Sequence, residues 1–124
     1  MTALATESHY RSGASVFDRL ERLLPLVKKP IQYVGGEVNA VVKDWDDCSV
    51  RWCLMYPDAY EVGIPNQGVQ ILYEVINEVP DALAERTYAV WPDLEALMRE
   101  HRVPQFTVDG HRPVGAFDVF GLSF

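Results

Sequence analysis

Four residues in one short loop carry the side chains best suited to hold a ligand. The stretch PDAYEVG places Asp58, Tyr60, Glu61 and Gly63 directly after an apolar run. Two carboxylates oppose an anionic ligand and favour hydroxyl, amide or cation contacts, and the glycine lets backbone approach a ligand closely. The alternative is a loop in which Tyr60 only packs against its neighbours. We predict these four residues as cofactor- or substrate-binding contacts.

The rest of the sequence offers little for catalysis or metal binding. Cys48 and Cys53 are its only cysteines. A structural zinc site usually takes four Cys or His ligands, and an iron–sulfur cluster commonly four cysteines. An acid–base pair of Asp58 and Glu61 would have no accompanying nucleophile, metal set or phosphate loop. We therefore predict no catalytic and no metal-binding residues in this chain.

A second stretch, VDGHRPVG, is similar to the Asp-x-His-x-x-Gly signature of cobalamin-binding domains, in which the His ligates cobalt. Val114 occupies the position where the signature requires glycine, and Gly115 comes one residue late. The signature also belongs after the first parallel strand, whereas Asp109-Gly110 is typical of a hairpin turn. We predict a turn here and no cobalt ligation by His111.

Strands and helices alternate from residue 49 onward. Apolar and β-branched runs predict strands at 49–57, 85–91 and 117–124, and helical spacing predicts helices at 68–80 and 92–102. This order is typical of an α/β, Rossmann-like fold whose partly parallel sheet has about three parallel strands. The loop with Asp58 then lies at the carboxyl end of the first strand, where open α/β sheets bind ligands. Asn66 is the expected N-cap of the helix that follows.

The residues before position 49 are predicted as a flexible leader followed by an extension of that domain. Residues 1–14 have the composition of a flexible leader, and the apolar spacing of 15–29 predicts a helix interrupted at Pro25. Ser15 and Asp18 resemble a capping box at its start.

Two antiparallel hairpins are expected beside the parallel strands. The β-rich run 37–45 is predicted to pair with 49–57, and residues 105–114 are predicted to fold back at Asp109-Gly110. The domain boundaries are therefore a leader at 1–14, a helix-and-hairpin extension at 15–48, and a Rossmann-like domain at 49–124.

The predicted sheet is apparently incomplete at the C-terminus. A doubly wound sheet normally has about five or more strands, and this chain ends on its most apolar one. An uncovered apolar edge promotes association. We expect either a fragment of a longer protein or a chain that completes its sheet with a partner chain or with itself.

Composition excludes several classes of partner. The chain has 124 residues and a net charge of −7. Residues 44–124 carry five Lys/Arg against fourteen Asp/Glu, so this region repels phosphate backbones and we expect no nucleic-acid binding. No apolar run is long enough to span a membrane, and no secretory signal is recognisable. A cytoplasmic location is expected.

Three stretches together resemble the amino-terminal, cobalamin (vitamin B12)-binding-like domain of an uncharacterised family of radical SAM proteins. They are KPIQYVGGEVNAVVKDW (29–45), YPDAYEVGIPNQGVQILYEVIN (56–77) and ERTYAVWPDLEALMRE (85–100). The family loop commonly reads PDxYEVGMSHxGLQILY, whereas this chain has Ile64-Pro65-Asn66 in place of Met-Ser-His.

The resemblance implies a non-catalytic domain that positions a cofactor or substrate for a radical SAM barrel, in the same protein or in a partner chain. In such proteins the barrel carries the Cys-x3-Cys-x2-Cys motif, the [4Fe–4S] cluster and S-adenosylmethionine, and none of that motif occurs here. For this chain the resemblance leaves bound cobalamin, another ligand or a purely structural role open. The alternative from another class is a stand-alone interaction protein.

Overall fold

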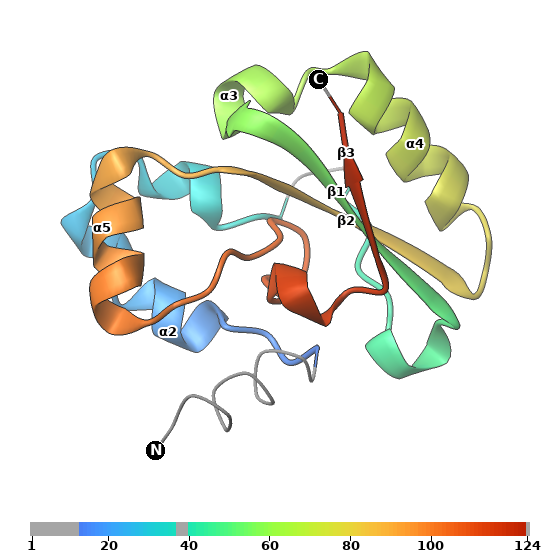
Figure 1. Ribbon diagram of the computed structural model, residues 1–124, viewed down its shortest axis with the longest axis horizontal. Coiled ribbons are helices and arrows are strands. Elements are labelled where there is room, and N and C mark those ends of the chain that lie inside the picture. Colours follow the sequence, from blue (N-terminus) through green and yellow to red (C-terminus); the bar gives the residue numbers. More distant parts are fainter. Residues whose placement is uncertain (1–12, 37–39, 124) are drawn as a thin grey trace.

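A three-stranded sheet lies at the centre of the computed structural model, which describes residues 13–36 and 40–123 (Figure 1). Its strands are β1 (Val50–Ala59), β2 (Ala82–Ala89) and β3 (Val119–Leu122). They stand in the order β2-β1-β3, and both neighbouring pairs are parallel. The α/β, Rossmann-like class predicted from the sequence is confirmed.

Helix α4 (Gln67–Asn77) connects β1 to β2 and covers one face of the sheet. Its buried residues Val69 and Tyr73 pack against Leu54 of β1 and Ala84 of β2. The predicted N-cap is confirmed, because Asn66 Oδ1 accepts the N–H of Val69 at 3.0 Å. The short helix α3 (Tyr60–Gly63) precedes α4 at the carboxyl end of β1.

Helix α5 (Pro92–His101), predicted at 92–102, follows β2 and forms a second core with the N-terminal segment. Figure 1 shows α2 (Phe17–Glu21) beside α5. The buried residues of this core are Val16, Leu20, Leu23, Leu24, Tyr33, Leu94, Met98, Val103 and Phe106. The N-terminal segment therefore packs on α5, and the N–H of Val16 also donates to the carbonyl of His111 at 2.8 Å.

The N-terminal helix is much shorter than the sequence predicted. α2 spans five residues, and the 3₁₀ turns Leu24–Leu26 and Pro30–Tyr33 replace the rest. Pro25 lies in the first of these turns, where its missing N–H breaks the α-helical ladder. The predicted capping box of Ser15 and Asp18 is wrong, because the N-cap is Val16 and Ser15 Oγ accepts the N–H of Phe17, the first residue of α2, at 3.1 Å. The predicted leader lies outside the described residues except for Gly13 and Ala14.

The predicted hairpin of 37–45 with 49–57 is also wrong. Residues 40–44 form no strand, Trp45–Asp47 is a 3₁₀ turn, and 37–39 lie outside the described residues. Side-chain contacts hold this run instead. The ammonium group of Lys43 donates to three backbone carbonyls at 2.7–3.0 Å, those of Asn77, Val79 and Ala82. It thereby ties the run to the turn between α4 and β2.

The second predicted hairpin reduces to one antiparallel bridge, between Phe106 and Pro113. A turn at 108–110 is present as expected. The left-handed residue is His111 (φ 52°) rather than Gly110, so the turn is not the tight two-residue type that Asp-Gly favours. Residues 105–112, here called the edge segment, lie along the outer edge of β2. The N–H of Val108 donates to the carbonyl of Arg86 at 2.8 Å.

The β3 edge has no such cover among the described residues. Phe120 is 50% exposed and Leu122 47% exposed. A cavity of about 230 Å³ with mainly apolar walls opens between β3 and α4, lined by Trp52, Leu54, Met55, Val69, Leu72, Ile76, Gly121, Leu122 and Ser123. In the described part of the chain, no helix has the length and apolar character needed to cross a membrane.

Candidate functional site

The loop predicted to bind a ligand lies at the carboxyl ends of β1 and β2, but two of its four residues mainly serve packing. The ring of Tyr60 meets that of Tyr88 edge-on, with centroids 5.5 Å apart. Gly63 is buried, and a Cβ at this position would overlap the Tyr88 ring. The glycine therefore lets α3 approach β2, and its predicted ligand contact stays a prediction.

The other two residues, Asp58 and Glu61, line a cavity of about 380 Å³, here called the loop cavity. Its remaining walls are Ala59, Val62, Ala89, Val90, Trp91 and Pro92. Asp58 Oδ1 accepts the N–H of Ala59 at 2.7 Å. Lys29 Nζ lies 3.3 Å from Glu61 Oε1 and 4.3 Å from the centroid of the Trp91 ring. The positive charge of Lys29 offsets the negative charge of Glu61, so the loop repels anions less than its sequence indicated.

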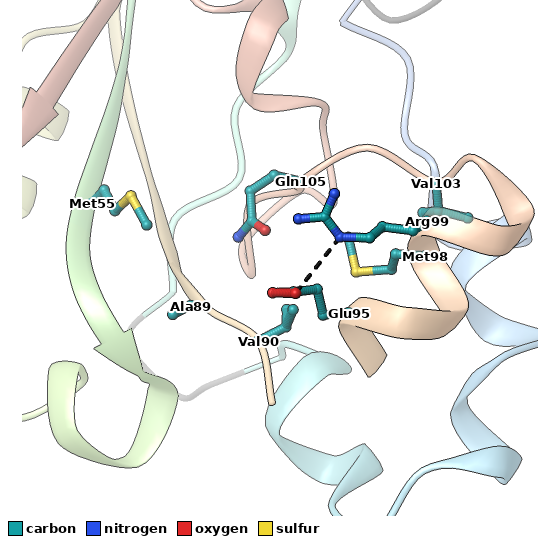
Figure 2. Close-up of a pocket in the computed structure, with 8 residues that line it drawn as sticks. All are labelled: Met55, Ala89, Val90, Glu95, Met98, Arg99, Val103 and Gln105. Carbon is teal, nitrogen blue, oxygen red and sulfur yellow. Dashed lines mark ion pairs between the residues drawn. The ribbon is translucent and has the colours of Figure 1, made fainter. Parts of the chain in front are cut away.

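A second cavity, of about 330 Å³, lies on the α5 side and shares Ala89 and Val90 with the first (Figure 2). We call it the α5 cavity. Its apolar walls include Met55, Met98 and Val103, and its polar residues are Glu95, Arg99 and Gln105. Sequence reasoning missed this site, because Gln105 and Met55 are far apart in the chain and belong to no local motif.

His111 does not fit an axial cobalt ligand. Its Nε2 lies 2.6 Å from the carbonyl oxygen of Tyr33, and its ring is 4.7 Å from that of Phe17 and 5.8 Å from that of Phe106. Burial lowers the pKa of this imidazole. Asp109, which would orient the ring in the cobalamin signature, binds Arg86 instead.

The volumes of both cavities lie at the lower end of the range of about 300–1,000 Å³ for ligand pockets. Cys48 and Cys53 are buried free thiols, and burial raises the pKa of Cys53. Within residues 13–36 and 40–123, no group of three or more His, Cys, Asp or Glu side chains could hold a metal ion.

A buried cluster of charges, also missed by sequence reasoning, fixes the edge segment to β2. Asp109 Oδ1 accepts from Arg86 Nη2 at 2.6 Å and from the Tyr73 hydroxyl at 3.1 Å. Asp109 Oδ2 accepts the backbone N–H of Arg86 at 2.8 Å. Burial raises the pKa of Asp109, and the bonds from Arg86 and Tyr73 oppose that rise. This carboxylate stands in for the carbonyl that a neighbouring strand would offer.

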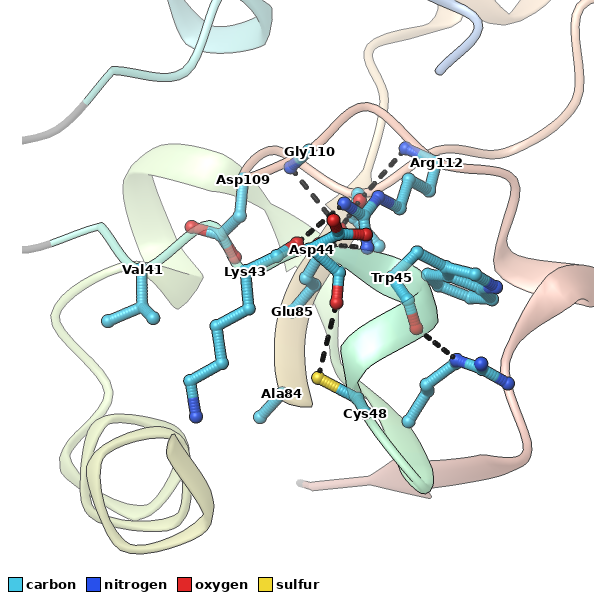
Figure 3. Close-up of polar contacts among 12 residues, drawn as sticks. Val41, Lys43, Asp44, Trp45, Cys48, Ala84, Glu85, Asp109, Gly110 and Arg112 are labelled. Atoms are coloured by element: carbon cyan, nitrogen blue, oxygen red, sulfur yellow. Dashed lines mark hydrogen bonds and ion pairs between the residues drawn. The ribbon is translucent and has the colours of Figure 1, made fainter. Parts of the chain in front are cut away.

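Glu85 anchors the same segment from the other face of β2 (Figure 3). Its Oε1 accepts from the Thr107 hydroxyl at 2.5 Å and from the N–H of Gly110 at 3.2 Å. Arg112 Nη1 lies 3.4 Å from Glu85 Oε2, and Arg112 Nη2 donates to the carbonyl of Lys43 at 2.8 Å. The sequence signal for this cluster was the pair of adjacent charged residues Glu85 and Arg86 in a predicted strand. A buried carboxylate such as that of Glu85 requires polar partners.

Comparison with known proteins adds one match. Residues 68–124 match the family model of radical SAM proteins, N-terminal. The match covers 57 of the 124 residues, from the start of α4 through the edge segment to β3. It supports a relation to radical SAM proteins and is not specific to a cobalamin-binding-like domain. No curated protein and no solved structure matches the chain.

Proposed function

We propose that this chain is a non-catalytic N-terminal domain of a radical SAM protein that holds a ligand for the catalytic barrel. The observation that carries the proposal is the match of residues 68–124 to the N-terminal region of such proteins. The parallel sheet supports it, since both cavities lie at the carboxyl ends of strands, where α/β folds bind ligands.

The barrel in this proposal supplies the [4Fe–4S] cluster and the S-adenosylmethionine, which together provide the radical chemistry. The chain's own residues bind and orient. Asp58 and Glu61 offer carboxylate acceptors in the loop cavity, and Lys29 beside Glu61 offers a cation. The two buried thiols suit a reducing compartment, and we place the protein in the cytoplasm.

The first test asks whether the domain works with a barrel. In the natural gene, the reading frame after Phe124 should encode three closely spaced cysteines of the type Cys-x3-Cys-x2-Cys. In the full protein, the double variant Asp58→Asn, Glu61→Gln should retain reductive cleavage of S-adenosylmethionine while losing at least tenfold in product formation. Asp46→Asn, Asp47→Asn is the matched control on an exposed turn. A frame without those cysteines would refute the proposal.

Anaerobic titration with hydroxocobalamin, followed by absorbance, tests cobalamin as the ligand. Because His111 is held in the core, we expect no spectrum of histidine-ligated cobalt. A spectral change without such ligation would support a corrin bound at the carboxyl ends of the strands. A spectrum of histidine-ligated cobalt in the wild type that is lost in His111→Phe would show that His111 ligates cobalt. That result would overturn the assignment of His111 to the core.

A second candidate function is that of an interaction protein whose β3 edge pairs with a partner chain or a second copy. The half-exposed Phe120 and Leu122 and the apolar cavity beside α4 favour it. Sedimentation velocity tests it. The weight-average mass should rise with concentration, and Phe120→Lys, Leu122→Lys should abolish the rise. The control is Leu26→Lys, because Leu26 is also an exposed apolar residue (66%) but does not belong to β3. A wild-type monomer at every concentration, alone and with its barrel, would refute this candidate.

A further inference from the structure

We propose that the α5 cavity binds an aromatic heterocycle that carries an exocyclic amino group, such as an aminopurine or aminopyrimidine. The cavity combines an oriented acceptor, a second acceptor and a donor at its mouth, and two thioether walls. The proposed function assigns ligand contacts only in the loop cavity, to Asp58, Glu61 and Lys29. The present inference names the ligand of the α5 cavity, and it holds whether or not the chain works with a radical SAM barrel.

The oriented acceptor is the side-chain oxygen of Gln105. Its Nε2 donates to Thr87 Oγ1 at 2.8 Å and to the carbonyl of Tyr88 at 2.7 Å, which uses both amide hydrogens and fixes the amide. Figure 2 shows the oxygen of Gln105 on the side of Glu95 and Arg99. No hydrogen bond from any described residue reaches this oxygen. It is therefore a fixed acceptor at the cavity that awaits a donor.

The second acceptor is the carboxylate of Glu95, one turn before Arg99 on α5. The two form an ion pair with Arg99 Nε 3.6 Å from Glu95 Oε1, and both side chains are more than half exposed. Such a pair is weak and can open toward a ligand. An amino group on a ring can donate to Gln105 and Glu95, and the adjacent ring nitrogen can accept from Arg99.

The walls favour a flat aromatic body. Met55 of β1 and Met98 of α5 line opposite sides of the cavity (Figure 2). Methionine sulfur makes favourable contacts with aromatic rings and adapts to their shape. Ala89 and Val90 leave one wall short and apolar. A ring inserted here would bury both faces against aliphatic and thioether groups.

Rejection of the keto analogue follows from the same geometry. Replacement of the amino group by a carbonyl would bring two acceptors, the ring carbonyl and the Gln105 oxygen, into opposition. Sites built to bond a donor discriminate strongly against analogues without it, because an acceptor that the bound ring shields from water is left unpaired. Preference for amino over keto rings is therefore the signature of this site.

The test titrates the whole chain with two matched pairs, adenosine against inosine and cytidine against uridine, with methionine methyl NMR signals as the readout. The amino member of each pair should bind at least tenfold more tightly and should shift the signals of Met55 and Met98. Equal affinity within both pairs, or no shift at either methionine at millimolar nucleoside, would overturn the proposal.

Two variants locate the effect. Glu95→Gln, at an exposed position that the fold tolerates, should weaken adenosine binding several-fold, while Glu100→Gln on the same helix should not change it. Gln105→Met should abolish the amino-over-keto preference, with circular dichroism used to verify that the variant folds. Unchanged affinity and preference in both folded variants would refute the assignment of these residues.

Discussion

The two edges of the sheet are finished in opposite ways. Beyond β2, the edge segment supplies one backbone–backbone hydrogen bond, several side-chain hydrogen bonds and buried charges, and all residues of β2 from Ala82 to Tyr88 are buried. Beyond β3, apolar side chains remain half exposed. Polar contacts therefore cover the β2 edge of the sheet, and the β3 edge is the surface suited to association.

The largest effect is expected where the closed edge is broken. Arg86→Met leaves Asp109 buried without its guanidinium, and loss of one partner from a buried pair costs about 3–5 kcal/mol. Urea denaturation measures the change. Lys29→Met removes an ion pair whose side chains are 43% and 47% exposed and should cost less than about 1 kcal/mol. Equal losses of stability in Arg86→Met and Lys29→Met would contradict the expected difference between a buried and an exposed ion pair.

The same truncation at the two edges sharpens the comparison. Leu83 on β2 is fully buried, and Leu83→Ala should cost about 2–5 kcal/mol through lost contacts and a residual cavity. Leu122 on β3 is 47% exposed, and Leu122→Ala should cost less than about 1 kcal/mol. Thermal and urea unfolding of both variants test this. A loss at Leu122 as large as that at Leu83 would show that β3 is covered in solution.

A smaller effect is expected at the carboxyl end of the sheet. Gly63→Ala places a Cβ against the ring of Tyr88, and overpacking of this kind costs about 1–3 kcal/mol. Gly115→Ala is the matched control, because a Cβ there meets no atom within 4 Å, and its effect should stay within about 0.5 kcal/mol. Urea midpoints compare the two. A neutral Gly63→Ala would place α3 farther from β2 than described.

The smallest effect is a pH dependence from the edge segment. Burial lowers the pKa of His111 from its ordinary value of 6.5, so the folded chain keeps this ring neutral. Its stabilisation is fully present above about pH 6.5 and is lost as pH falls through 6.5 toward the lowered folded value. The loss is at most about 1.4 kcal/mol per pH unit.

Unfolding free energies at pH 7.5, 6.5 and 5.5 measure this dependence. His111→Phe should show a shallower decline than wild type, whereas His101→Gln, at the exposed end of α5, should decline like wild type. Because Glu85 and Asp109 titrate in all three proteins, the difference between the curves isolates His111. A wild-type slope in His111→Phe would show that the imidazole is not the source.

Local patterns in the sequence predicted the parts of the fold that local forces decide. Periodicity and capping predicted α4 with its Asn66 cap, and proline and acidic residues at its start predicted α5. The alternation of elements predicted the parallel sheet. The run 37–45 has strand propensity, yet residues 40–44 form no strand. Hydrogen bonds of the Tyr73 and Lys43 side chains hold this part of the run in an irregular path. Tertiary contacts thus overrode propensity.

The sequence indicated where the candidate site lies, and ligand binding there stays a prediction. Asp58 and Glu61 follow a buried strand and line the loop cavity, whereas the packing role of Gly63 depends on Tyr88, which is distant in sequence. The Arg86–Asp109 pair and the fixed amide of Gln105 join residues 17–23 positions apart. No local spacing rule encodes such pairs, because the fold alone brings them together.

The contact between α2 and α5 has a consequence for the order in which the chain is made. The guanidinium of Arg19 donates to the carbonyls of His101 and Arg102, 82 and 83 residues farther along. Leu20 is buried in the same cluster as Leu94 and Met98 of α5. During synthesis the leucines of the N-terminal segment therefore stay exposed until α5 has left the ribosome. Closure over such long sequence distances slows folding and makes this interval the one in which a chaperone would matter most.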